Sequence, residues 1–522
     1  MDTKALRQKI LDLAIRGKLV PQDPNDEPAS VLLERIREQK KQMVKDGKLK
    51  PKDIKKDTVI FKGDDNLHYE KFSDGTVKCI EDEIPFELPE GWAWVRLKSV
   101  IHFIRNGASI KQYRAAKGLP ITRIETIATG AIDRNRLGYA NIFEVDKYAS
   151  YILKDYDILM SHINSPKHLG KCALYENKGN EKIIHGMNLL AIRTFSCSLA
   201  KYMCIVFRST VFKEFVWEHM KQAVNQASIT TTSISNLLFA IPPVEEQTRI
   251  IDFFDDANKY IIEIDTDKDI IEQDISFAKS KILDLAIHGK LVPQDPNDEP
   301  ASVLFERIRE EKEELIKQGK IKRDKKESVI FKGDDNSYYE KIGNKTENID
   351  DQIPFDLPQG WIWCRGYSCF DGMESTKPHG DFFDYIDIDA IDNQNHCIKE
   401  AKHLPVTKAP SRASRAVKNG SVLFSLVRPY LENIALVDEK YCNCIASTGF
   451  YVCNSNGMLL PEFMYFLMIS GYVVTGLNQF MKGDNSPSIC KDDIENWLYP
   501  VPPIKEQEIV SLKLKSILST IK

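Results

Sequence analysis

The chain has 522 residues, of which 42% are hydrophobic and 28% are charged, and its formal net charge is −4. This length is too great for one hydrophobic core, so the chain is expected to fold as several domains. The composition excludes disordered and collagen-like proteins. No apolar run approaches the roughly 18 residues of a membrane span, so no membrane partner is expected. The polar start MDTKALRQK lacks a secretory apolar stretch, which predicts a cytoplasmic location.

A long internal repeat governs the organisation of the chain. The segment KILDLAIRGKLVPQDPNDEPASVL begins at Lys9 and returns at Lys281 with one difference in 24 positions. Similarity continues at IPFELPEGWAW (Ile84) and IPFDLPQGWIW (Ile353), and resumes in the segments that end in PPVEEQ (Pro242) and PPIKEQ (Pro502). The chain is therefore a duplicated frame around two inserts that differ in sequence.

The repeat predicts five segments. They are an N-terminal helical frame at 1–90, a first insert at 91–243, a central long helix with further frame at 244–359, a second insert at 360–503, and a C-terminal helix at 504–522 that packs on the frame.

Within the first frame segment, apolar residues on one face predict a helix from about Ala29 to Asp46, with Gly47 as its left-handed stop. The repeat predicts the same helix at Ala301–Gln318, before Gly319. The inserts contain short apolar runs bounded by Gly, Asn and Pro, which predict strands. Each insert then has a helical stretch, around Leu199–Val224 and around Pro461–Asn478.

The segment from Pro243 to Gly289 contains no internal Gly or Pro and carries apolar residues at alternating steps of four and three. Only Lys268 interrupts this apolar seam, whose period is typical of a coiled-coil helix. The seam recurs in the C-terminal residues and again in the N-terminal residues, so the second copy is a broken helix. We therefore predict an α+β protein with two mixed α/β domains at the ends of a long antiparallel helical spacer. Its repeat is pseudo-two-fold and circularly permuted.

The net charge conceals an uneven distribution. Gly91–Glu245 has 20 Lys and Arg against 11 Asp and Glu, whereas Gly360–Lys505 has 13 against 16. The second insert nevertheless gathers six basic residues between Lys402 and Arg428. Either cluster alone is typical of a solvated charged face, but one in each insert of a duplicated frame favours phosphate contact and the reading of bases.

The candidate DNA-binding residues are basic, amide or hydroxyl side chains of the inserts. In the first insert they are Arg105, Lys111, Arg114, Arg123, Arg134, Arg136, Asn164, Lys167, Gln222, Asn225, Gln226 and Thr231. In the second insert they are Lys377, Lys408, Arg412, Arg415, Arg428, Tyr430, Lys482, Asn485 and Ser486. We expect fewer than half of them to touch a base.

Catalytic signatures are missing from the sequence. It contains no phosphate-binding loop, no glycine-rich dinucleotide turn and no H-E-x-x-H motif. Dispersed histidines such as His162 are more typical of satisfied polar residues than of ligands. We therefore predict no catalytic residue, no cofactor site and no metal site in this chain.

The repeated KILDLAIxGKLVPQDPNDEPAS segment, the P-x-GW motifs at Pro89–Trp92 and Pro358–Trp361, and the two PPxxEQ motifs resemble the specificity subunit of a type I restriction-modification system. This resemblance covers essentially the whole chain. It implies that each insert is a target-recognition domain that reads one half of a bipartite double-stranded DNA target.

The resemblance also implies partners. Two modification subunits that methylate adenine would dock on the helical frame, and two restriction subunits can optionally join them to make an ATP-driven nuclease. S-adenosylmethionine, ATP and Mg would belong to those subunits. The final helix ends about two heptads after Gln507, so a short distal helix would weaken one of the docking sites.

Two other interpretations stay open from the residues alone. In the first, the chain is a helical scaffold or adaptor whose inserts bind proteins rather than DNA. In the second, the chain methylates or cuts DNA by itself, which the missing catalytic motifs disfavour.

Overall fold

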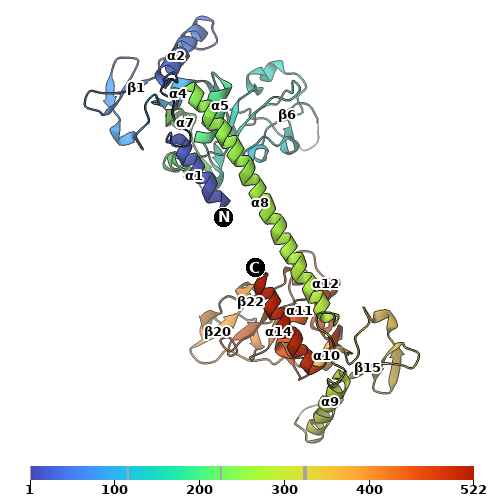
Figure 1. The fold of residues 1–522 in the computed structure, drawn as a ribbon. Coiled ribbons are helices and arrows are strands. Elements are labelled where there is room, and N and C mark those ends of the chain that lie inside the picture. The colour runs from blue at the N-terminus through green and yellow to red at the C-terminus, as the bar shows by residue number, and fades with distance from the viewer. Residues whose placement is uncertain (1, 114–116, 224–225, 321–325, 522) are drawn as a thin grey trace. The chain divides into compact units, whose positions relative to one another are not determined.

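The structure is a computed structural model, and it describes residues 2–113, 117–223, 226–320 and 326–521. It consists of two units, Met1–Lys268 and Asp269–Lys522. Figure 1 shows helix α8 (Val244–Ile287) as one uninterrupted green helix that begins in the first unit and ends in the second.

The first unit mixes helices and strands. Its helices are α1 (Thr3–Ile15), α2 (Ala29–Lys45), α3 (Pro51–Ile54), α4 (Leu97–Val100), α5 (Cys197–Val206), α6 (Thr210–His219) and α7 (Thr231–Ser235). Its strands are β1 (Val59–Lys62), β2 (His68–Lys71), β3 (Val77–Cys79), β4 (Ala93–Arg96), β5 (Ile101–Asn106), β6 (Pro120–Ile121), β7 (Gly138–Tyr139), β8 (Ile158–Ser161), β9 (Ile163–Asn164), β10 (Cys172–Leu174), β11 (Leu189–Thr194), β12 (Lys221–Ala223), β13 (Gln226–Ser228) and β14 (Leu238–Ile241).

The second unit has the same kinds of element. Its helices are α9 (Ala301–Lys317), α10 (Gly366–Cys369), α11 (Pro461–Met468), α12 (Gly471–Asn478), α13 (Lys491–Asn496) and α14 (Ile504–Thr520). Its strands are β15 (Ser328–Lys332), β16 (Tyr338–Ile342), β17 (Lys345–Asn348), β18 (Ile362–Arg365), β19 (Phe370–Asp371), β20 (Phe382–Ile386), β21 (Ile391–Asp392), β22 (Cys397–Ile398), β23 (Lys402–Pro405), β24 (Ala413–Ala416), β25 (Val422–Ser425), β26 (Ile434–Leu436), β27 (Ile445–Ser447), β28 (Phe450–Ser455) and β29 (Leu498–Val501).

The predicted mixture of helices and strands is confirmed. The helices predicted after the PQDPNDEP segments are α2 and α9, and both end before a glycine with positive φ, Gly47 at +72° and Gly319 at +69°. The helical stretch predicted around Leu199–Val224 is partly wrong. It is two short helices, each capped by a serine hydroxyl, and then strand β12, because Ser209 restarts the helix and the chain turns extended after Met220.

Each insert contains one four-stranded sheet of the same strand order. The order is β10-β8-β11-β5 in the first unit and β26-β25-β28-β19 in the second. In the first unit, strand β11 is followed along the chain by helices α5 and α6. In the second unit, the equivalent strand β28 is followed by α11 and α12. The second unit adds a further four-stranded sheet, β23-β20-β27-β24, in which β20 and β27 run parallel. The inserts therefore share a central sheet and differ in what surrounds it.

The frame closes each insert with a pair of antiparallel strands. Strand β4 follows the first Gly-Trp motif and pairs with β14, which ends just before Pro242. Strands β18 and β29 form the equivalent pair before Pro502. Both ends of each insert are thus held at one place in the frame.

Two glycines fix the contact between the frame helices and these strands. Gly17 and Gly289 both have a φ of +64°, and a Cβ on either one would lie within 2.4 Å of a ring carbon of Pro89 or Pro358. Only glycine adopts this left-handed conformation freely and also admits so close a neighbour. This contact explains why the repeat retains both the AIxGK and the LPxGW segments.

A buried carboxylate connects three of the repeated motifs in each unit. Glu246 accepts hydrogen bonds from Trp92 Nε1 at 2.8 Å and from Gln22 Nε2 at 3.1 Å. The second unit repeats this arrangement with Glu506, Trp361 and Gln294 at 2.8 and 3.0 Å. Both carboxyl groups lie in the first turn of a helix, where the helix dipole favours negative charge.

Helix α8 packs against a chain end in each unit. In the first unit Thr3 Oγ1 donates to Asp265 Oδ1, and Arg7 Nε donates to Asn258 Oδ1 at 3.2 Å. In the second unit, Leu283 and Ala286 of α8 share a hydrophobic cluster with Leu514 of α14. Between these contacts the apolar seam is open, since Ile271 is 56% exposed.

Candidate nucleic-acid interface

Four of the predicted residues of the first insert gather where two segments cross, which we call the first loop crossing (162–168 with 221–223 and 226–229). Strand β13 lies between β12 and β9, so Gln222, Gln226 and Asn164 share one small three-stranded sheet. Ile229 N donates to His162 O at 3.0 Å and closes the crossing. Lys167 is exposed in the short 3₁₀ helix after β9, and Thr231 begins helix α7 just beyond.

The second unit has the same crossing, between residues 426–431 and 482–489, which we call the second loop crossing. Ile489 N donates to Leu426 O at 3.0 Å, the counterpart of the bond from Ile229 to His162. Val427 forms a β-bridge with Ser488. The five predicted residues that meet here are Arg428, Tyr430, Lys482, Asn485 and Ser486.

The backbone of Arg428 is held in an uncommon conformation at this crossing. Its φ is +48°, in the left-handed region that costs a non-glycine residue free energy. Its N–H donates to Pro487 O at 2.7 Å, and its Nη2 donates to Asn485 O at 3.0 Å. Tyr430, two residues on, is 46% exposed. The crossing therefore positions an exposed guanidinium and an exposed phenol on a strained, well-bonded loop.

The remaining basic candidates of the first insert lie outside the crossing. Arg105 Nη2 donates to Tyr151 Oη at 2.7 Å, and its guanidinium lies 4.0 Å from the centre of the Tyr151 ring. Lys111 lies 5.6 Å from the ring of Tyr113. These two cations rest on aromatic rings, a contact that orders the side chain without neutralising its charge.

Three other arginines of the first insert already face carboxylates. Arg134 forms a forked ion pair with Glu181, which raises the pKa of that guanidinium. Arg136 Nε lies 3.0 Å from Asp133, and Arg123 Nε lies 3.5 Å from Glu125. A guanidinium that pairs with a carboxylate has fewer donors left for DNA. Arg114 and Asn225 lie outside the described residues.

Four candidates of the second insert form a separate group around the second four-stranded sheet. Arg412 is exposed beside β24, an edge strand of that sheet, and Lys408 is exposed in the preceding loop. Arg415 lies in β24 and bridges to Ser375, two residues from exposed Lys377. Arg415 Nε is buried with no hydrogen-bond partner among the described residues.

Sequence reasoning missed several partners that shape this interface. Tyr151 and Glu181 are 46 and 47 residues from the arginines that they contact. No periodicity or motif connects such distant positions, so only the folded chain shows them. His162, which the sequence suggested is a satisfied polar residue, contacts Met187 O at 3.0 Å through Nε2, and its burial lowers its pKa.

The parts of the chain that the structure describes show no group of three or more His, Cys, Asp or Glu residues placed to hold a metal ion. They also contain no helix that is both long and apolar enough to cross a membrane.

Comparison with known proteins identifies a protein family whose model matches part of this chain. Residues 89–273 match the family model of the type I restriction modification DNA specificity domain. The chain is 27% identical to the type I restriction enzyme EcoAI specificity subunit of Escherichia coli, over 99% of this chain and 89% of that protein. It is 29% identical to the EcoEI specificity subunit of the same organism, over 82% of this chain and 73% of that protein.

A solved structure is similar to part of the chain. The HsdS subunit from Thermoanaerobacter tengcongensis is 35% identical over 32% of this chain and 44% of that chain, with a TM-score of 0.31. Fold and sequence together define a protein of two repeated α+β units, the first of which matches a DNA specificity domain. Residues 89–273 thus match a DNA specificity domain of type I restriction-modification systems, and the chain is similar over most of its length to specificity subunits of such systems.

Proposed function

We propose that the two inserts, 91–243 and 360–503, each read one half of a bipartite DNA target. The observation that carries this proposal is the pair of loop crossings, which have the same backbone bonds and different side chains. Asn164, Gln222 and Gln226 occupy the first crossing, whereas Arg428, Tyr430 and Lys482 occupy the second. Amide side chains suit adenine and guanidinium groups suit guanine, so the two crossings would prefer different bases.

The frame supports this reading by fixing each insert at both ends. The glycine contacts and the buried Trp–Glu hydrogen bonds recur in both units, so each insert is attached in the same way. In our proposal α8, together with α1 and α14, forms a coiled-coil spacer that sets the distance between the two half-sites. The same helices would dock two modification subunits, which two restriction subunits would join.

Catalysis then belongs to the partners. S-adenosylmethionine, ATP and Mg would bind to the modification and restriction subunits, and methylation of adenine requires the base to leave the duplex. This chain would supply sequence recognition and positioning only. Its affinity for DNA would come from phosphate contacts and fall steeply with salt.

The experiment is a selection of bound sequences from a randomised duplex, using the complex with modification subunits. We expect Arg428→Ala and Arg412→Ala each to weaken binding through the half-site that the second insert reads. If Arg428 reads a base, its loss removes about 1–3 kcal/mol of discrimination at one position. If either arginine contacts phosphate, binding weakens uniformly and the salt slope falls by about 1.

Arg309→Ala is the matched control, because Arg309 is an exposed frame arginine that pairs with Glu306 and Glu327. It should leave both half-site preferences unchanged. Equal loss of preference at both halves in Arg428→Ala, or no change in binding at all, would contradict the proposal.

A further inference from the structure

A pocket recurs at the same place in both units, where the frame meets the insert. In the second unit it has a volume of about 360 Å³ and is lined by frame residues such as Gln352 and insert residues such as Trp497. Its counterpart in the first unit has a volume of about 840 Å³ and includes Arg96 and Leu237. Each position that lines the smaller pocket has its repeat counterpart in the lining of the larger one. The pocket is therefore part of the repeated architecture.

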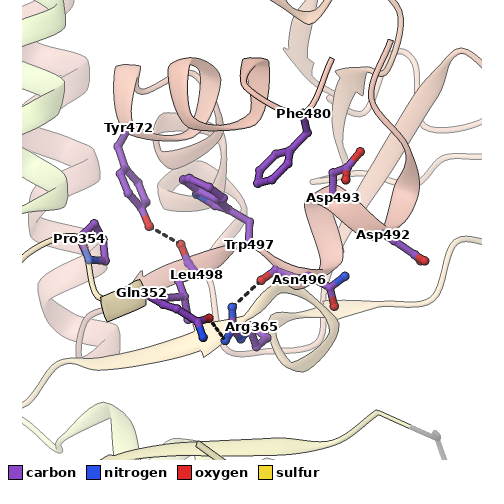
Figure 2. Close-up of a pocket in the computed structure, with 10 residues that line it drawn as sticks. All are labelled: Gln352, Pro354, Arg365, Tyr472, Phe480, Asp492, Asp493, Asn496, Trp497 and Leu498. Atoms are coloured by element: carbon purple, nitrogen blue, oxygen red, sulfur yellow. Dashed lines mark hydrogen bonds between the residues drawn. The ribbon is translucent and has the colours of Figure 1, made fainter. Parts of the chain in front are cut away.

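The pocket of the second unit has an aromatic wall. The ring centres of Tyr472 and Trp497 are 5.4 Å apart, and those of Phe480 and Trp497 are 6.0 Å apart. Figure 2 shows these three rings in a row, with Asp493 and Asp492 of helix α13 beyond Phe480 in this view. Phe480 is 37% exposed, so part of its ring is open to solvent.

The charged side chains that line this pocket are net negative, since Asp492 and Asp493 outnumber Arg365. The guanidinium of Arg365 is already engaged by Glu340 at 2.7 Å and by Gln352 at 2.8 Å. Asp492 is exposed and forms no ion pair within the described residues. Aromatic faces and carboxylates both attract cations, and a negative pocket repels DNA phosphates.

The pocket of the first unit is also net negative, because five carboxylates line it against Arg96 and Lys98. Arg96 binds Glu70 and Glu83 at 2.8 and 2.6 Å. Glu214, Glu218 and Asp82 also line the pocket and form no ion pair in the described part of the chain. Two pockets lie at matched positions, and carboxylates outnumber basic residues in each. This arrangement fits two copies of one partner, with a positively charged side chain of each copy binding at one pocket.

We propose that each pocket receives a lysine or arginine side chain from a modification subunit, one subunit per unit of this chain. The proposal rests on the proposed function, which places two such subunits on the frame, and it locates a contact outside the helices. In the second unit the cation lies against Phe480 and Trp497 and faces Asp492. In the first unit it faces Glu214 and Glu218. The different linings give the two docking sites different affinities and different salt dependence.

The test exchanges residues of the second pocket for their counterparts in the first. Phe480 corresponds to His219 and Asp492 to Thr232, so Phe480→His with Asp492→Thr keeps side chains that this architecture already holds. Asp492→Thr alone is the variant that protects the fold, because Asp492 is exposed. Asp334→Asn, at an exposed frame carboxylate outside the pocket, is the control.

Each full-length variant is titrated with the purified modification subunit by calorimetry at low and high salt. We expect the double variant to weaken one of the two binding steps about tenfold, and Asp492→Thr to weaken it less. The difference should shrink at high salt, while Asp334→Asn binds as the parent chain does. Unchanged affinity in the double variant overturns the inference. DNA binding by the parent complex is measured in parallel. Absence of sequence-specific DNA binding would contradict the proposed function, whereas unchanged subunit affinity in the double variant contradicts only the pocket contact.

Discussion

The central sheets of the two units are held across their middle strands by different chemistry at equivalent positions. In the first unit Arg193 Nε and Nη2 donate to the two oxygens of Asp157 at 2.5 and 2.6 Å, and the Asp157 side chain is 0% exposed. In the second unit, the equivalent strands place Ser421 and Asn454 there, with Oγ donating to Oδ1 at 2.6 Å. The same topology thus tolerates a buried ion pair or a neutral hydrogen bond.

The frame, in contrast to the central sheets, has the same contacts in both units. Its contacts recur residue for residue, as the Trp92–Glu246 and Trp361–Glu506 hydrogen bonds show at 2.8 Å each. This contrast teaches that the repeat preserves how an insert is attached and leaves its interior free to vary. Two differing inserts with a constant attachment are what the proposed reading of a two-part target would require.

The largest expected effect is a difference in stability loss between substitutions in the two central sheets. Asp157→Ala should lower the free energy of unfolding by about 3–5 kcal/mol, because it leaves the Arg193 charge, whose side chain is only 15% exposed, without its partner. Ser421→Ala should lower it by about 1–3 kcal/mol, because only a neutral group loses its hydrogen bond. Chemical denaturation of the full chain, followed by probes of each unit, measures both values. Equal costs would show that the two sheets do not differ as described.

A smaller and symmetrical effect is expected in the frame. Glu246→Ala and Glu506→Ala should each destabilise their own unit by about 1–3 kcal/mol, since each leaves a buried tryptophan Nε1 without an acceptor. The same denaturation experiment compares them. A large loss of unfolding free energy in only one unit would show that the two frames are not equivalent.

The smallest expected effect is a pH dependence. Burial raises the pKa of Glu246 above its ordinary value of 4.5. The stability that this protonated carboxyl contributes is fully present below 4.5 and is lost as pH rises through the raised value. Glu246→Gln keeps an acceptor for Trp92 and does not titrate.

The free energy of unfolding of the parent chain, measured against Glu246→Gln, should therefore fall as pH rises above about 4.5 and through the raised pKa of Glu246. Glu90→Gln, at an exposed carboxylate, is the control. A difference that stays constant across this range would refute the assigned effect of burial.

Much of the frame could be predicted from the sequence, because the repeat and the local helix signals act over short distances. Helices α2, α8 and α9 follow from the apolar periodicity and the glycine stops. The interior of the inserts could not, since their strands pair across long separations and only folding decides the order.

The candidate interface shows the same limit. Residue type and local charge indicated Arg428 and Asn485, which are 57 residues apart and share a hydrogen bond in the folded chain. The same signals indicated Arg134, whose charge is taken up by Glu181. Composition cannot distinguish a free arginine from a paired one, because the difference depends on a neighbour brought in by the fold.

The central claim is that two differing inserts read two halves of one target. Mapping methylated adenines in the genome of a cell that expresses this chain with its modification subunits tests it directly. We expect one motif made of two short specific blocks separated by a gap of fixed length, and Arg428→Ala should alter only one block. A single continuous motif, or changes in both blocks with Arg428→Ala, would contradict the account.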